Sequence, residues 1–354
     1  MQLAAAPRAP PCVRVPPRSA IRSRLHACDP ARSEAGYLRS LANTPAELLC
    51  DEESQHGNGR VRVLRHGDWL VMRCESTEQG IAFSDNGAAA PQVLGFHYLR
   101  VMAAAAVGAG SLDAGRLLCV GLGSGALPGF LAHHFGGACV QVAEVDPLVV
   151  RLAREHFHVR FTRAASVSLL VGSPQRGLTV LEADAGAVVC ALAAAVSSGS
   201  TPGASALFID AYAAYGTIPA HLRGTDFLTA CAASLAIGGV VCVNLFTGSP
   251  NSRPRRDVEL YAKLLMQALD GPVYSLTSAG EHNVVLLASK GRALCARELC
   301  EQATRVSQAG CWEWDAGALV QQLFQCSFRE EGGADAVAGE LTEGLEPLSA
   351  DESW

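Results

Sequence analysis

The segments VGLGSGALPGFL, residues 120–131, and VAEVDPLVVRLAREHF, residues 142–157, decide the fold of this chain. The first completes the apolar run of residues 116–121, which is typical of a buried parallel strand, and passes through a glycine turn into apolar residues at helical spacing. The second begins with another apolar strand, residues 139–145, after which Pro147 is favourable in the first turn of a helix. This succession predicts an α/β fold.

Further strand and helix patterns continue this alternation toward the C-terminus. The predicted strands cover residues 177–181, 206–210 and 240–246. A helix is predicted over residues 226–236, and residues 160–176 and 191–204, which are rich in small side chains, are predicted to be loops. The apolar segments 272–278 and 283–289 predict an antiparallel hairpin at the sheet edge. Repeated strand–helix units imply a mostly parallel sheet with helices on both faces.

Glycines and acidic residues stand where these predicted strands end. The set comprises Gly121, Gly123, Gly125, Glu144, Asp184 and Asp210. Ligands of parallel sheets bind outside the carboxyl ends of the strands, so these residues predict a nucleoside pocket. Glycine lets the backbone approach a ligand closely, and a carboxylate one βα unit later, Glu144, can accept both ribose hydroxyls. The loop also fits the looser dinucleotide pattern GxGxxG/A, but NAD would require a second βαβ half where this chain ends in a hairpin.

The composition disfavours several other classes of protein. The chain has 354 residues and a formal net charge of −6, and no basic face that would bind nucleic acid is expected. No window reaches about 18 uninterrupted apolar residues, so no membrane span is expected. The 13 cysteines form no CxxC pair, which argues against a zinc site, and no metal is predicted.

The two ends differ in composition from the middle. Residues 1–28 carry five arginines and no acid, with several prolines, as organelle transit peptides do. We expect residues 1–40 to be a transit or disordered segment directed to the chloroplast, with the mitochondrion or cytoplasm as alternatives. Residues 330–354 carry eight acids and no base, so a disordered acidic tail is predicted over 329–354.

In their order, the motifs of residues 120–157 resemble the S-adenosylmethionine-dependent methyltransferase superfamily, and within it the spermidine-synthase-like branch. The matching segments are VRVLRHGDWLVMRCESTEQGIAF (61–83), QVLGFHYLRVMAAAA (92–106), LEADA (181–185) and FIDAYAAYGTIPAHLRGTDFLTACAASLAIGGVVCVN (208–244). The resemblance implies a Rossmann-like class I methyltransferase fold over residues 101–292, with a terminal antiparallel hairpin. A small N-terminal β-unit with a linker helix (45–100) would precede it, and a helical extension (293–328) would follow.

The resemblance also implies roles for individual residues. In this family the glycine loop wraps the aminoacyl or aminopropyl part of the ligand. The acid that holds the ribose corresponds to Glu144, with Asp146 nearby as a further cofactor-binding residue, and the acid at the adenine amine corresponds to Asp184. Gln79 resembles a glutamine that lies over the bound cofactor. Asp210 matches the acid that binds and deprotonates the attacking amine in aminopropyltransferases.

Three departures from the family pattern concern the acceptor. Ser124 stands where aminopropyltransferases carry an acid in the glycine loop, and Ala213 stands where they carry a second acid after the fourth strand. The sequence Phe96-His97-Tyr98 replaces a YHE segment that supplies a further carboxylate. A polyamine carries several positive charges, which need several carboxylates when they are desolvated. Spermidine synthesis is therefore disfavoured.

We accordingly expect an S-adenosylmethionine-dependent methyltransferase, since methyl transfer needs only a positioned nucleophile and a base. Asp210 and Tyr212 are the expected catalytic residues, with Asp210 as the base. Tyr212 and Tyr215 would shape the acceptor pocket, and His221 is an alternative candidate for the base. One alternative is a polyamine aminopropyltransferase that uses decarboxylated S-adenosylmethionine, and another is a non-catalytic cofactor-binding or assembly protein. The acceptor would be a small molecule or a protein, and a homodimer is among the expected forms.

Overall fold

The computed structural model describes residues 30–321 and 324–325, apart from 86, 111, 173, 217, 248–252 and 278–282. Residues 1–29 of the expected transit segment and the acidic tail lie outside this part. Residues 30–40 do not continue a disordered segment as expected: they form the 3₁₀ turn η1 (Pro30–Arg32) and the beginning of helix α2 (Glu34–Asn43). Within the described residues, no helix is both long and apolar enough to cross a membrane.

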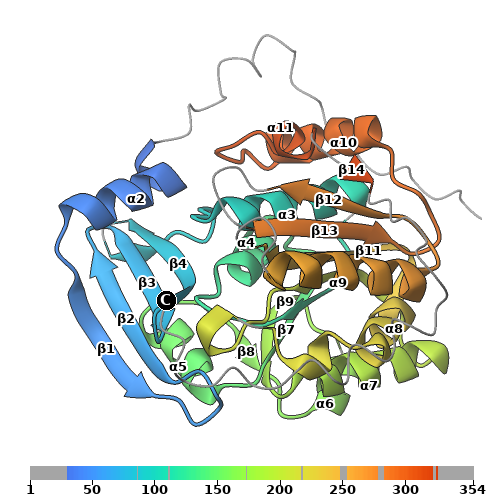
Figure 1. Ribbon diagram of the computed structural model, residues 1–354, viewed down its shortest axis with the longest axis horizontal. Helices are drawn as coiled ribbons and strands as arrows, with labels where there is room; N and C mark the ends of the chain where they lie inside the picture. The colour runs from blue at the N-terminus through green and yellow to red at the C-terminus, as the bar shows by residue number, and fades with distance from the viewer. Residues whose placement is uncertain are drawn as a thin grey trace, which may run out of the picture.

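The larger sheet has the predicted parallel centre and antiparallel edge. Its parallel strands are β6 (Arg116–Val120), β7 (Cys139–Glu144), β8 (Thr162–Arg163), β9 (Gly177–Glu182), β10 (Ala204–Ile209) and β11 (Leu235–Phe246). Its antiparallel strands are β12 (Val273–Thr277), β13 (Asn283–Ser289) and β14 (Phe324–Gln325). Among the described residues the strand order is β14-β12-β13-β11-β10-β6-β7-β9-β8, which confirms the Rossmann-like class (Figure 1).

Helices cover both faces of this sheet. The helices α3 (His97–Ala109), α4 (Ala126–His134) and α5 (Pro147–Glu155) share one apolar core with it. The other core is shared by α6 (Val167–Gly172), α7 (Ala185–Ser197), α8 (Thr225–Ser234) and α9 (Arg253–Leu269). The helices α10 (Ala296–Ala309) and α11 (Ala316–Val320) pack outside α3 (Figure 1).

The loop predictions for residues 160–176 and 191–204 were wrong in part. The first range contains β8 and α6, and the second contains the last turns of α7. Small residues had suggested a loop, but alanine has the highest helix propensity, and α7 buries Val188, Val189 and Leu192 against the sheet.

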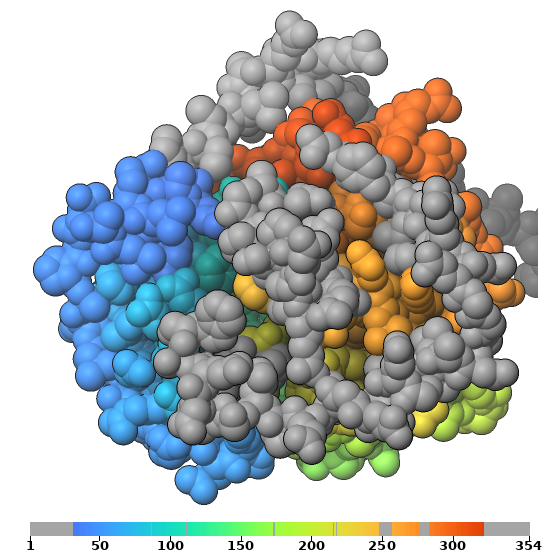
Figure 2. All heavy atoms as spheres, viewed as in Figure 1, coloured from blue at the N-terminus to red at the C-terminus, as the bar shows by residue number. Residues whose placement is uncertain are grey.

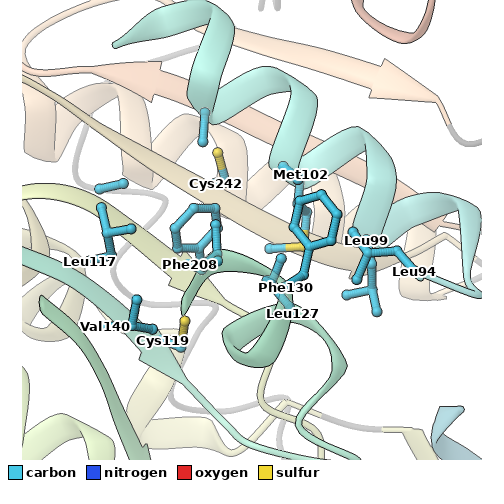
Figure 3. Close-up of a cluster of buried hydrophobic side chains, with 14 of the residues drawn as sticks. Leu94, Leu99, Met102, Leu117, Cys119, Leu127, Phe130, Val140, Phe208 and Cys242 are labelled. Atoms are coloured by element: carbon cyan, nitrogen blue, oxygen red, sulfur yellow. The ribbon is translucent and has the colours of Figure 1, made fainter. Parts of the chain in front are cut away.

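Strand alternation explains why the sheet has two separate cores. Leu117 and Cys119 of β6 contribute to the core under α3 and α4, whereas Leu118 and Val120 contribute to the opposite one. Figure 3 shows the first core, where Leu99 and Met102 of α3 and Phe130 of α4 gather with strand side chains such as Phe208 and Cys242. Helix α3 is apolar on nearly all sides because α10 and α11 cover the face that points away from the sheet.

A second, antiparallel sheet forms the expected N-terminal β-unit. Its strands, in spatial order, are β1 (Glu47–Glu53), β2 (Arg60–His66), β3 (Trp69–Cys74), β4 (Thr77–Asp85) and β5 (Ala88–Ala89). Helix α2 docks on it through Tyr37, whose ring centroid lies 5.6 Å from that of Trp69. The unit lies beside the larger sheet in Figure 1 and forms the blue to cyan side of the molecule in Figure 2. Its strand β4 contacts the glycine loop after β6, since the hydroxyl of Ser124 donates to the carbonyl of Ile81 at 3.3 Å.

Candidate active site

A cavity of about 870 Å³ lies at the carboxyl ends of the parallel strands and is closed on one side by the N-terminal sheet. Its carboxylates are Glu34, Glu78, Glu144, Asp184 and Asp210. Within the described residues, no lysine or arginine lines it. Glu78 is compensated by Arg73, whose guanidinium lies 2.7 Å away. The cavity is therefore suited to a ligand that carries positive charge.

The glycine loop packs so tightly against neighbouring backbone that side chains are excluded at Gly121 and Gly123. Gly121 and Gly123 have positive φ angles of 96° and 52°, which glycine adopts without strain. A Cβ atom at Gly121 would collide with the carbonyl oxygen of Asp210, and one at Gly123 would lie 2.6 Å from the carbonyl oxygen of Gln79. Gly125 is the N-cap of α4 and makes no side-chain cap, so the first N–H groups of α4 have no side-chain acceptor there. Gly121, Leu122, Gly123 and Ser124 line the cavity, whereas Gly125 does not.

Glu144 ends β7 at the predicted edge of the sheet. Its carboxylate is buried and accepts hydrogen bonds from the N–H groups of Leu122, at 2.9 Å, and Asp146, at 3.0 Å. Burial raises the pKa of Glu144, and the backbone hydrogen bonds oppose that rise because they favour the ionised form. Two oxygens in the cavity lining are thereby oriented beside the glycine loop, where a sugar diol would be held.

Asp146 was predicted to contact the cofactor, but its carboxylate is occupied by the protein. One oxygen caps α5 through the N–H of Leu148, at 2.9 Å. The other accepts from the hydroxyl of Ser54, at 2.6 Å, and from the side-chain amide of Asn58, at 2.7 Å. Asp146 is completely buried and is not part of the cavity lining. The structure therefore contradicts a direct contact.

Gln79 of β4 lies in the cavity lining, as the resemblance implied for a residue over the cofactor. Its side-chain Nε2 is buried and has no hydrogen-bond partner within the described residues. A buried donor without a partner costs free energy, and in native proteins such groups are usually satisfied. The amide of Gln79 thus lacks an acceptor that a bound molecule would supply.

Asp184 and His221 form a pair in the cavity lining. Asp184 is the N-cap of α7 and accepts from the N–H of Ala187 at 2.9 Å through one oxygen. The other oxygen lies 2.7 Å from Nε2 of His221, which belongs to the turn η3 (Ala220–Leu222). Both side chains are largely exposed, so a ligand can replace the His221 contact at little cost.

Asp210 follows the last residue of β10 and lies in a half-buried hydrogen-bonded network. One carboxylate oxygen accepts from the hydroxyl of Tyr98 at 3.2 Å, and the other accepts from the side-chain amide of Asn244 at 2.9 Å. The oxygen of Asn244 in turn accepts from the amide of Asn283 at 2.8 Å, which fixes the orientation of Asn244. Burial raises the pKa of Asp210, and the hydrogen bonds from Asn244 and Tyr98 partly offset this. A half-buried carboxylate with a raised pKa is a suitable general base.

The catalytic role predicted for Tyr212 is not supported by its contacts. Its hydroxyl donates to the carbonyl of Asn244 and accepts from the N–H of Phe246, both at 2.9 Å. Burial also raises its pKa above the ordinary tyrosine value. The hydroxyl therefore ties the segment after β10 to the end of β11, and its proton is engaged in the bond to Asn244. Tyr215 lies in the turn η2 (Ala214–Gly216), with its side chain outside the described part of the chain.

Sequence reasoning missed three residues of this site. Asn244 lies near the carboxyl end of β11, so the strand-end argument that found Asp210 would also have found it. Tyr98 was recognised only as a departure from a family motif, and its contact with Asp210 depends on how α3 packs. Glu34 accepts from the N–H of His97 at 3.0 Å, and no signal marked it because its segment was expected to be disordered.

The hydrogen bond from Tyr98 leads to a prediction about proton affinity. The hydroxyl of Tyr98 stabilises the ionised carboxylate of Asp210. Replacing Tyr98 by phenylalanine removes this donor and is therefore expected to raise the pKa of Asp210 further. Because the pKa of Asp210 is already raised in the folded chain, the protonated group contributes favourably to the free energy of unfolding at low pH. This contribution is lost as the pH rises from about 4 through the raised pKa of Asp210. Carbon-13 NMR of labelled aspartate should show a higher midpoint in the variant, and equal midpoints would contradict the hydrogen bond.

Among the described residues, no group of three or more histidine, cysteine, aspartate or glutamate side chains is placed to hold a metal ion.

No family model and no curated protein sequence matches the chain.

Several solved structures share the fold of this chain. A probable spermidine synthase from Corynebacterium glutamicum ATCC 13032 is 16% identical, with a TM-score of 0.56 over 86% of this chain and 99% of that one. Human methyltransferase-like protein 13 in complex with SAH is 21% identical, with a TM-score of 0.50 over 61% and 92%. A spermidine synthase in complex with the transition state analogue AdoDATO is 16% identical, with a TM-score of 0.51 over 73% and 77%. At these identities the likeness concerns the fold, and it confirms the one that the motifs suggested: the chain has the spermidine-synthase-like fold of the S-adenosylmethionine-dependent methyltransferases.

Proposed function

We propose that this protein is an S-adenosylmethionine-dependent methyltransferase. The observation that carries the proposal is the meeting, in one cavity, of the glycine loop, the oriented carboxylate of Glu144 and the half-buried carboxylate of Asp210. The buried amide of Gln79, which has no partner within the described residues, fits a bound nucleoside that would accept from it. Neighbours of the same fold hold SAH and AdoDATO, which supports a ligand of this class.

Each residue would have a separate task toward the cofactor. Glu144 would accept hydrogen bonds from the ribose hydroxyls, and Asp184 would accept from the adenine amine. The amide of Gln79 would donate to the cofactor from the N-terminal sheet. S-adenosylmethionine, when bound, supplies an electrophilic methyl group on a positively charged sulfur, and the carboxylates of the cavity offset that charge.

Asp210 would take the proton of the attacking amine or hydroxyl of the acceptor. Its raised pKa brings its proton affinity closer to that of the group it must deprotonate. Tyr98 and Asn244 hold the two carboxylate oxygens from opposite sides, so the base is oriented before the acceptor binds. The aromatic rings of Tyr98 and Phe96, with centroids 5.5 Å apart, would line the acceptor end and exclude water.

Aminopropyl transfer from decarboxylated S-adenosylmethionine is a second candidate, and one observation favours it. Glu34, which comes from a segment ahead of the motifs, adds a carboxylate to a lining without lysine or arginine in the described part. Such a cavity also suits a cationic acceptor. Against it, Tyr98 and Ala213 stand where the family carries acids. Methyl transfer therefore remains the first proposal.

The product of turnover distinguishes the two candidates. The purified protein would be incubated with either cofactor and a panel of amine and hydroxyl acceptors that includes a diamine. Methyl transfer releases S-adenosylhomocysteine, and we expect this product with S-adenosylmethionine only. Methylthioadenosine from the decarboxylated cofactor would establish aminopropyl transfer instead. If both cofactors bind and neither product forms with any acceptor, the protein is a non-catalytic binder and the proposal fails.

A further inference from the structure

The loop between β1 and β2, residues 54–59, lies against the main domain through a single carboxylate. Ser54 and Asn58, both buried, donate to the same oxygen of Asp146 at 2.6 and 2.7 Å. Two donors on one ionised oxygen form charge-assisted hydrogen bonds, which are stronger than neutral ones. The other oxygen of Asp146 caps α5, so the carboxylate cannot rotate away from the loop without leaving the helix uncapped.

Ser54 also organises the loop internally. Its N–H donates to the carbonyl of Gly59 at 2.8 Å, which closes the loop at its base. Its hydroxyl oxygen accepts from the N–H of His56 at 2.9 Å while the hydroxyl proton is given to Asp146. One hydroxyl thus joins the backbone at His56 to a residue of the main domain that is 92 positions away from Ser54.

The loop forms part of the cavity next to Glu144. His56 and Asn58 are in the cavity lining, whereas Ser54 and Asp146 are not. The backbone N–H of Asp146 donates to Glu144 at 3.0 Å, so Asp146 is bonded to the strand-end carboxylate as well as to the loop. A second tie between β1 and α5, the ion pair of Glu52 and Arg151 at 2.6 Å, is exposed and contributes little.

From these contacts we propose that Asp146 is a positioning residue: it joins the two halves of the site by holding the β1–β2 loop, with His56 and Asn58, against the ribose end of the cavity. The inference rests on the proposed cofactor for its effect on binding. Its structural part, the attachment of the loop, is independent of the cofactor. The affinity for the nucleoside would then depend on a hydroxyl, that of Ser54, which does not line the cavity.

The test uses the full chain with Ser54→Ala, which leaves the cap of α5 and all lining side chains in place. We expect this variant to weaken binding of S-adenosylhomocysteine by about tenfold, measured by calorimetry. Without the hydroxyl of Ser54 the loop is less ordered in the free protein, so part of the binding free energy is consumed in ordering it. In the protein without ligand, amide hydrogen exchange over residues 54–59 should become faster, with the rest of the chain unchanged. The matched control is Ser234→Ala in α8, which removes a buried hydroxyl that bonds the carbonyl of Cys231 at 2.8 Å, away from the cavity. It should leave both readouts within twofold of the unmodified protein.

The outcomes separate the inference from the proposed function. Unchanged affinity and unchanged exchange in Ser54→Ala would overturn the positioning role, as would an equal loss of affinity in Ser234→Ala. If the unmodified protein does not bind S-adenosylhomocysteine, the proposed function fails and the exchange measurement decides alone. Faster exchange confined to residues 54–59 then supports the attachment, and unchanged exchange overturns it.

Discussion

Replacing Glu144 by glutamine is expected to weaken binding of S-adenosylhomocysteine by about a hundredfold or more. The carboxylate accepts from two backbone N–H groups, those of Leu122 and Asp146, and in the proposed complex also from the ribose hydroxyls. A glutamine amide has one acceptor oxygen, and its NH₂ group would face an N–H donor. The variant therefore loses the ribose acceptor and leaves a buried donor unsatisfied.

Calorimetry measures this effect, and Glu155→Gln is the matched control. Glu155 lies in the last turn of α5, exposed to solvent, and pairs with Arg151 at 2.9 Å. Its replacement should change the affinity by less than twofold, because exposed ion pairs contribute little. In the unmodified protein, affinity should fall as the pH is lowered through the raised pKa of Glu144, since only the ionised form accepts from both hydroxyls. Retained affinity in Glu144→Gln would show that the ribose is held elsewhere.

Replacing Asp210 by asparagine is expected to slow methyl transfer by about 10²- to 10⁴-fold, the usual contribution of a general base. Asparagine keeps the size of the side chain and can still bond Tyr98 and Asn244, but it cannot take a proton. The carboxylate is directed at the acceptor rather than at the nucleoside, so the affinity for S-adenosylhomocysteine should change by less than about threefold. The rate should fall while cofactor binding persists.

The rate would be measured as S-adenosylhomocysteine formed per enzyme molecule and unit time, with the acceptor found in the panel. Asp226→Asn, in the exposed first turn of α8, is the matched control and should retain the full rate. A variant at Asp210 with the full rate would remove this residue from the mechanism. One that loses cofactor affinity to the same extent as rate would make Asp210 a binding residue instead.

The sequence was sufficient for the sheet and for the acids at its edge. Strands such as β6 and β10 are buried on both faces and therefore appear as short uninterrupted apolar runs, which few other structures produce. Because the carboxyl ends of parallel strands meet at one edge, Glu144 and Asp210 could be placed in the same cavity without coordinates.

The roles of Asp146 and Tyr212 could not be obtained in this way. Both residues follow strand ends, but their polar atoms are occupied by partners that only the tertiary structure brings close. Asp146 bonds Ser54, 92 positions away, and Tyr212 bonds the carbonyl of Asn244, 32 positions away. Residue type and spacing indicate that a polar group lies at the edge of a sheet. Whether it faces a ligand or another segment depends on packing between distant parts of the chain.

The measurement that tests the central claim most directly is calorimetric titration of the unmodified protein with S-adenosylmethionine, its decarboxylated form and NAD. The account predicts that S-adenosylmethionine binds at one site per chain and more tightly than the decarboxylated form, and that NAD does not bind. Tighter binding of the decarboxylated form would favour aminopropyl transfer. Absence of binding by both adenosyl compounds would contradict the assignment of this cavity as a cofactor site.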